Sequence, residues 1–159
     1  MDRATRFIIW NQLEILKALK PDEADDIEIQ QDVIASGYTT RYEDLMPSIS
    51  LEEASQEMQE EVLEILDMFR ALSIARNNGW KPSRVDASKF QGFDGNNDPH
   101  YFFADHLLNS RGLFAESAPN KNSHSMGTIS KYRRMLAVWK ASHEKFELTD
   151  VEAEAVISA

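Results

Sequence analysis

The chain has 159 residues, of which 42% are hydrophobic and 28% are charged, and its formal net charge is −10. This length suits one domain with a sizeable core, so we expect a single domain over residues 1–159. The absence of cysteine excludes disulfides, thiol nucleophiles and cysteine-ligated zinc. No apolar run approaches the roughly 18–20 residues that span a membrane, and the N-terminus lacks the features of a signal peptide. We therefore expect a cytoplasmic protein with no membrane association.

Charge is distributed unevenly along the chain. Residues 21–67 contain fifteen acidic residues and one basic residue, a net charge of −14, whereas residues 68–146 contain six acidic and twelve basic residues, a net charge of +6. Such a separation can steer the association of subunits, and it is also compatible with two surfaces that face each other within one fold or are simply solvated. The acidic balance disfavours nonspecific binding to nucleic acid, which depends on neutralising phosphates.

Two helices are predicted near the N-terminus. Residues 4–19 have helical periodicity, with apolar side chains at Phe7, Ile8, Leu13, Ile15, Leu16 and Leu19. After Pro21, residues 22–35 form a second helix, which Gly37 ends in a left-handed cap. Residues 38–46 contain a short helical piece that Pro47 closes.

A long central helix is the clearest element of the pattern. Ser50 and Glu53 have the spacing of a capping box at its start, and Asn77-Asn78-Gly79 is a signal for its end. One face carries an apolar stripe, made of Leu51, Ala54, Met58, Val62, Ile65, Phe69 and Leu72.

Three further helices are expected after a connector over residues 80–97. Asp98 resembles an N-cap with Pro99 at the first helical position, which predicts a helix over residues 99–110. Residues 128–142 form the next helix, and Thr149 with Glu152 makes a capping box that opens the last one. The side chains expected to be buried are Phe102, Phe103, Leu107, Leu108, Ile129, Tyr132, Leu136, Trp139, Val151, Val156 and Ile157. The sequence therefore predicts an all-α fold, a compact helical bundle of about six helices around a long central helix.

No motif predicts a metal or cofactor site. Asp94, Asn96 and Asp98 follow the opening of a calcium-binding loop, but Pro99 stands where a glycine is needed and Asp105 where a bidentate glutamate is needed. A turn followed by a helix cap explains these residues better. The histidines lack the spacing of a zinc helix, so we assign no metal ligand.

Catalytic and nucleic-acid motifs are also missing. Ser123 lies directly beside His124, which is poor geometry for a nucleophile and its base, and there is no nucleophile elbow or phosphate-binding loop. The helix over residues 128–142 is basic, but Tyr132 and Trp139 fall on its apolar face, where core positions are expected rather than base-stacking platforms. We assign no catalytic residue and expect no nucleic-acid partner.

The charge pattern suggests a surface for a protein partner. An acidic stripe on the central helix could receive the basic helix of a neighbouring subunit, and a symmetric dimer is the commonest oligomer. We therefore expect a homo-oligomer, with a dimer favoured. The predicted partner surface consists of Glu53, Glu57, Glu60, Glu64, Asp67, Lys131, Arg134 and Lys140.

The order of several motifs resembles the YfbU family of bacterial proteins. The resemblance is carried by Phe90 with Gly92-Phe93-Asp94, by Asn122-Ser123-His124, and by the run from Tyr132 to Trp139. It implies an α-helical cytoplasmic protein of bacteria and supplies no catalytic residue.

The same segments would supply any polar site, at Asp94, Asn96, His100, Asn122, His124, Tyr132 and Arg133. The competing interpretation is that the aromatic residues are core and the polar ones cap helices and turns. The leading hypothesis is a non-enzymatic interaction or regulatory protein that self-associates. The alternative is an enzyme or small-ligand binder with a polar site near Asp94, His100 and His124.

Overall fold

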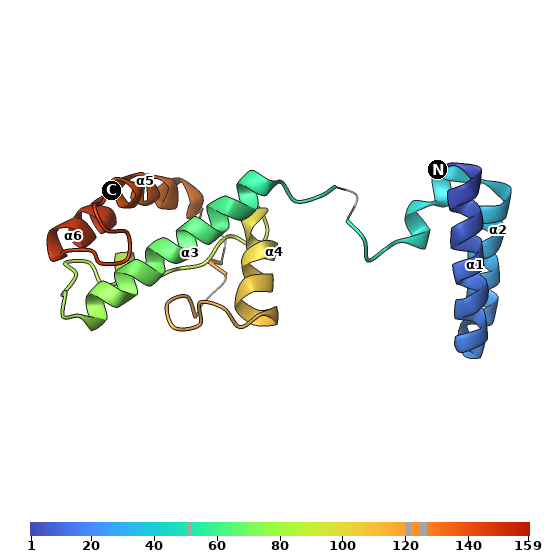
Figure 1. Ribbon diagram of the computed structural model, residues 1–159, viewed down its shortest axis with the longest axis horizontal. Coiled ribbons are helices and arrows are strands. Elements are labelled where there is room, and N and C mark those ends of the chain that lie inside the picture. The colour runs from blue at the N-terminus through green and yellow to red at the C-terminus, as the bar shows by residue number, and fades with distance from the viewer. Residues whose placement is uncertain (51, 120–121, 125–126) are drawn as a thin grey trace. The chain divides into compact units, whose positions relative to one another are not determined.

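Helices are the regular secondary structure in the part of the chain that the structure describes. The structure is a computed structural model that describes residues 1–50, 52–119, 122–124 and 127–159. Its regular elements are helices, apart from one isolated β-bridge between Phe93 and Asn122, so the predicted all-α fold is confirmed (Figure 1). Within these ranges no helix has both the length and the apolar character needed to cross a membrane.

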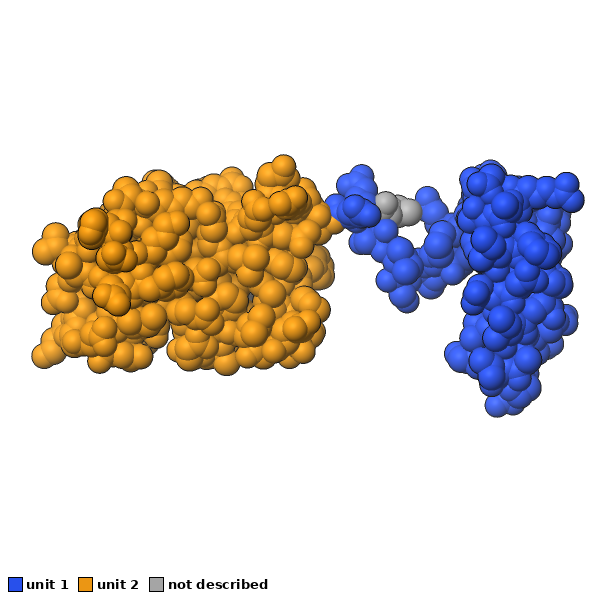
Figure 2. Space-filling model, in the orientation of Figure 1, with its two compact units in different colours: residues 1–53 blue, residues 54–159 orange. Residues whose placement is uncertain are grey.

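The chain divides into two compact units (Figure 2). Unit 1 comprises residues 1–53 and unit 2 comprises residues 54–159. Each unit has its own cluster of buried apolar side chains. We describe each unit by itself, and a single domain over residues 1–159 stays a prediction.

Unit 1 is a pair of helices that lie side by side (Figure 1). Helix α1 runs over Arg3–Leu19 and helix α2 over Ala24–Ser36, with a 3-10 turn at Pro21–Glu23 between them. Both predicted helices are confirmed, as is the left-handed cap at Gly37, which has a φ of 72°. The expected short helical piece is present as two 3-10 turns over Thr39–Arg41 and Glu43–Leu45.

The core of unit 1 is small. It contains Leu13 of α1 with Ile27 and Ile34 of α2, and a few half-buried side chains pack around them. Of the six apolar side chains whose spacing predicts the first helix, only Leu13 is buried. The reason is geometric: α2 covers one side of α1, whereas apolar residues lie on more than one side.

Unit 2 is organised around α3, which runs over Gln56–Asn77. The expected capping box of Ser50 and Glu53 is wrong, because Ser55 caps the helix and its Oγ accepts a hydrogen bond from the Met58 amide at 3.2 Å. Leu51, expected on the buried stripe, lies outside the described residues. The predicted end of the helix is confirmed, with Asn78 at the C-cap.

The remaining helices of unit 2 are α4 (His100–Asp105), the π-helical turn η5 (His106–Ser110), α5 (Ile129–Lys140) and α6 (Asp150–Ser158). The capping box of Thr149 and Glu152 is confirmed at the start of α6. The expected N-cap role of Asp98 is wrong, because its Oδ2 accepts from the Asp94 amide at 2.8 Å and α4 begins only at His100.

Ala54, expected on the apolar stripe of the central helix, is exposed and precedes α3, and two side chains expected to be buried on the shorter helices are exposed as well. Phe102 is 71% exposed and Val151 is 79% exposed. Phe102 and Val151 each stand on a short helix whose neighbouring apolar residues turn toward α3 or α5, so their own side chains face away from those helices. Of the expected core positions on α5, Tyr132, Leu136 and Trp139 are buried as predicted, whereas Ile129 is half-buried.

Aromatic rings form the centre of unit 2. Phe69 of α3, Phe90, Phe93 and Tyr132 of α5 have ring centroids 5.1–5.8 Å apart, mostly in edge-to-face arrangements. Such pairs contribute about 0.5–1.5 kcal/mol beyond the area that they bury. This cluster fixes the segment at Phe90–Phe93 against α5.

Candidate functional site

The segment of residues 90–93 is tied to α5 and to the loop before it by polar contacts. The carbonyl of Gly92 accepts from Thr128 Oγ1 at 2.8 Å and from the hydroxyl of Tyr132 at 3.1 Å. The amide of Ser123 donates to the Phe93 carbonyl at 2.8 Å, beside the isolated bridge. Two segments that are about 30 residues apart in the sequence therefore lie side by side, as the candidate polar site required.

Tyr132 has a structural role at this junction. Its hydroxyl also accepts from the Gln91 amide at 3.0 Å, and its side chain is fully buried. Burial raises the pKa of Tyr132, so the phenol stays protonated and can donate to Gly92. The residue is thus a hydrogen-bonded part of the core.

Asp94 and Asn96 belong to a closed turn. The two carboxylate oxygens of Asp94 accept from the Asn96 amide at 2.9 Å and from Asn97 Nδ2 at 2.6 Å. These hydrogen bonds, led by that of Asn97, lower the pKa of Asp94. With the bond from its own amide to Asp98, Asp94 holds the turn that leads into α4.

His100 and Arg133 meet at a third residue, Glu61 of α3. His100 Nε2 lies 2.7 Å from Glu61 Oε2, while Arg133 donates from Nε to Oε1 at 2.6 Å and from Nη2 to Oε2 at 2.9 Å. The bidentate arginine and the histidine occupy both carboxylate oxygens, a strong form of charge-assisted hydrogen bonding. The cluster joins α3, α4 and α5.

The electrostatics of this cluster are those of a fixed ion pair. The hydrogen bonds from Arg133, with a smaller contribution from His100, lower the pKa of Glu61 to about 2 against the opposing effect of burial. The carboxylate is therefore ionised at neutral pH and has no proton to give. His100 Nδ1 is enclosed and has no hydrogen-bond partner in the described residues, so it is not presented to a substrate.

A groove of about 560 Å³ runs past this cluster between α3 and α5. Its walls include Glu57, Glu60 and Glu64 of the predicted partner surface together with Lys140. Lys140 Nζ lies 2.6 Å from Glu64 Oε2 in the same chain. The acidic and basic helices thus face each other within unit 2 at this pair.

The other members of the predicted partner surface have varied surroundings. Asp67 pairs with Arg70 of its own helix at 3.5 Å, and Arg134 donates to the Ala159 carbonyl at 3.0 Å. Lys131 is half-buried and lies 3.4 Å from Gln91 Oε1. Glu53 belongs to unit 1 and is exposed. A partner on this surface stays a prediction.

Asn122 and His124 lie at a different cavity from His100 and Arg133. They line a space of about 290 Å³ together with Lys89 and Phe90. Asn122 Oδ1 accepts from the His124 amide at 2.8 Å, a local turn that holds His124 at a positive φ of 52°. The structure therefore divides the predicted polar residues among a turn, a core tyrosine, an ion-pair cluster and this loop.

Glu61 is the residue that the sequence pattern did not single out. It lies among the acids of α3, one residue after Glu60, and belongs to no catalytic or metal-binding motif. The available signal was its position four residues after Glu57 and three before Glu64, on a face of α3 that a basic helix could cover.

The geometry defines an all-α protein made of a two-helix unit and a larger unit, in which ion pairs between side chains connect the helices. Over its whole length, residues 1–159, the sequence matches the YfbU domain. The chain belongs to the YfbU family, and the resemblance noted from its motifs is confirmed.

Proposed function

We propose that this protein is a non-enzymatic interaction protein that self-associates through the outer face of α1. The observation that carries the proposal is an apolar stripe on that face. Ile8, Ile15 and Leu19 are 59%, 57% and 74% exposed. At about 100° per residue they fall on the side of α1 opposite Leu13, which packs against α2. Contiguous exposed apolar residues of this kind mark interaction surfaces.

The charged residues of α1 support this assignment, because they turn toward α2. Glu14 Oε1 accepts from Gln31 Nε2 at 2.6 Å, and Lys17 Nζ lies 3.0 Å from Glu28 Oε1. The outer stripe is left uncharged, with Gln12 between Ile8 and Ile15. The spacings of four, three and four residues from Ile8 to Leu19 are those of a helix that packs along a partner helix.

A second copy of the chain is the partner that fits this surface. Unit 1 has twelve acidic and five basic residues, a net charge of −7, so two copies repel each other wherever charged faces meet. The stripe on α1 avoids that repulsion, and an uncharged apolar patch is self-complementary, as a twofold contact requires. Two α1–α2 pairs joined in this way would form a four-helix arrangement around a larger core.

The expected affinity is modest. Full burial of one leucine or isoleucine contributes about 1.5–3 kcal/mol, so six partly exposed side chains in a symmetric contact supply roughly 5–10 kcal/mol. Association itself costs about 4–15 kcal/mol in lost freedom of motion. We therefore expect a dimer whose population depends on protein concentration in the micromolar range or above. The companion proposal is a cytoplasmic location, which fits a cysteine-free chain because it has no disulfide to form in an oxidising compartment.

Sedimentation velocity of the full chain over a series of concentrations tests the proposal. We expect the wild type to shift from monomer toward dimer, and Ile15→Glu to remain monomeric, because the substitution places two mutually repelling carboxylates, one from each copy, into a contact that was apolar and desolvates both. The matched control is Ile29→Glu, since Ile29 is 66% exposed on α2 and lies outside the stripe. A monomeric wild type at high micromolar concentration, or equal effects of the two variants, would refute the proposal.

A further inference from the structure

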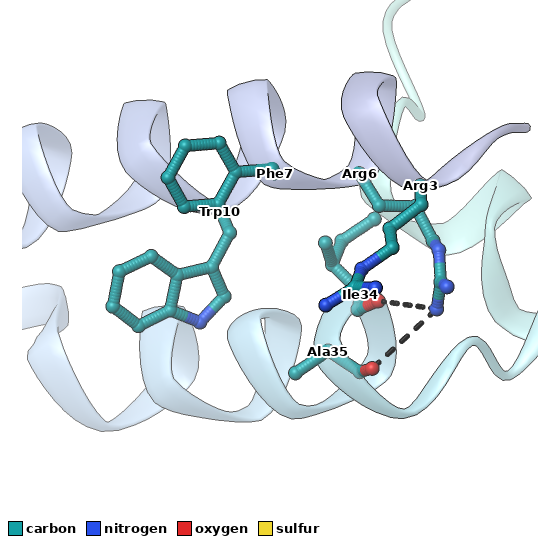
Figure 3. A pocket seen from close by; sticks show the side chains of 6 residues that line it. All are labelled: Arg3, Arg6, Phe7, Trp10, Ile34 and Ala35. Atoms are coloured by element: carbon teal, nitrogen blue, oxygen red, sulfur yellow. Dashed lines mark hydrogen bonds between the residues drawn. The ribbon is translucent and has the colours of Figure 1, made fainter.

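A second feature of unit 1 is a cavity of about 360 Å³ between α1 and α2 (Figure 3). It lies on the other side of α1 from the apolar stripe, because Arg3, Arg6 and Trp10 project roughly opposite to Ile8 and Ile15 at about 100° per residue. The residues that line it are Arg3, Arg6, Phe7, Trp10, Ile34 and Ala35.

The two arginines of this cavity differ from the other cations of unit 1. Lys17, Lys20 and Arg41 each lie 2.9–3.0 Å from a carboxylate oxygen. Arg3 and Arg6 have no ion pair with any residue that the structure describes. In a unit with a net charge of −7, the two cations without a carboxylate partner therefore line the same cavity.

Arg6 is held in place by the end of α2. Its Nη1 lies 3.3 Å from the Ile34 carbonyl and 3.4 Å from the Ala35 carbonyl, as the dashed lines of Figure 3 show. A guanidinium group has five N–H donors, so the donors on Nε and Nη2 remain for another group. Because these contacts fix the side chain, little freedom is lost when an acceptor binds.

The rest of the cavity is mainly apolar. Trp10 is half-buried between the helices, and Phe7 and Ile34 add apolar surface beside it (Figure 3). The indole N–H of Trp10 is a further donor. A cavity near the lower end of the roughly 300–1,000 Å³ found for small-molecule sites, with an apolar wall and cationic donors, selects a small ligand with an apolar body and an anionic end.

We propose that this cavity binds a small organic carboxylate with an aromatic or branched aliphatic body. The planar carboxylate matches the planar fork of an arginine, which donates two parallel hydrogen bonds. Arg3 and Arg6 bind the carboxylate, and Trp10 and Phe7 contact the body of the ligand. The site is independent of the proposed self-association, since no residue of the stripe lines it.

The test uses the ¹⁵N-labelled full chain, with phenylacetate as the probe. We expect the indole N–H resonance of Trp10, assigned by its loss in Trp10→Phe, to shift in a saturable manner. Trp80 and Trp139 are 5% and 3% exposed and serve as internal references. Phenylacetamide, which has the same body without the charge, should bind at least about tenfold more weakly, because hydrogen bonds to a charged group are the stronger kind.

Two variants make the experiment specific. Arg3→Gln should weaken phenylacetate binding by about tenfold or more, since among the described residues it is Arg6, and not Arg3, that donates to the carbonyls of α2, so the fold loses no such bond. Arg41→Gln removes an equivalent charge whose partner is Asp44, and should leave binding unchanged. Equal binding of the acid and the amide, equal binding by Arg3→Gln and the wild type, or an unshifted Trp10 resonance at millimolar phenylacetate would each overturn the proposal.

Discussion

Arg6 Nη1 lies 2.6 Å from the position that a Cβ atom at Gly37 would occupy. Gly37 also has a φ of 72°, in the left-handed region that a side chain disfavours. The approach of Arg6 to the last carbonyls of α2 and the glycine cap of the same helix are therefore parts of one arrangement.

The first prediction concerns this cap. Gly37→Ala should destabilise unit 1 by roughly 1–2 kcal/mol from the left-handed backbone alone, and by more when Arg6 must also move. In an Arg6→Ala background only the backbone contribution should remain. Urea unfolding, followed by the indole N–H resonance of Trp10, measures both effects in unit 1. Thr40→Ala, at an exposed position of the same unit, is the control and should change stability by less than about 0.5 kcal/mol. A loss in Thr40→Ala as large as that in Gly37→Ala would contradict this account.

The second prediction concerns the ion-pair cluster of unit 2. The pKa of Glu61 is about 2, below its usual 4.5, so the ionised carboxylate stabilises the fold above pH 4.5 and this contribution is lost as the pH falls toward 2. Glu61→Gln should unfold at lower urea concentration than the wild type at pH 7, with the gap narrowing steadily between pH 4.5 and pH 2. Comparing the two proteins at each pH cancels the titration of other groups. A gap that does not change with pH would contradict the assignment.

The third prediction concerns the buried tyrosine. Tyr132→Phe removes the hydroxyl that donates to the Gly92 carbonyl and accepts from the Gln91 amide. Losing these two hydrogen bonds, each of which contributes about 0.5–1.5 kcal/mol, should lower the free energy of unfolding by about 1–3 kcal/mol. Tyr38→Phe is the matched control, since Tyr38 is 52% exposed, and it should change stability by less than about 0.5 kcal/mol. Chemical unfolding of the three proteins decides between a bonded hydroxyl and one that contributes nothing.

The fourth prediction tests the geometry of the proposed dimer. Gln12 lies near the middle of the stripe, so in an antiparallel twofold contact it approaches its own counterpart. Because the natural chain has no cysteine, Gln12→Cys introduces a single thiol, which mild oxidation should convert to a disulfide-linked dimer on a non-reducing gel. Ile29→Cys, on α2, should give little cross-linked product under the same conditions. Comparable yields from the two variants would argue against a contact through α1.

Local patterns along the sequence were sufficient for much of the helical structure. The periodic residues of α1 and α5, the glycine cap at Gly37 and the capping box of Thr149 and Glu152 are all present as predicted. Each depends on residues within about one helical turn of each other, so the chain itself carries the information. The predictions of helix caps at Ser50 and Asp98 were wrong, because serine and aspartate also suit turns. The carboxylate of Asp98 accepts a hydrogen bond from the Asp94 amide instead.

The sequence by itself determined that this is an all-helical chain of the YfbU family with no cysteine chemistry. The tertiary structure decided where its polar side chains act. Glu61 contacts His100, which is 39 positions away in the sequence, and Arg133, which is 72 positions away. Only the packing of α3, α4 and α5 brings these three residues together. The sequence likewise places the apolar residues Ile8, Ile15 and Leu19 on a predicted helix, but the position of α2 determined that they are exposed. Burial depends on which face a neighbouring helix covers, and that is a property of the packed chain rather than of its local pattern.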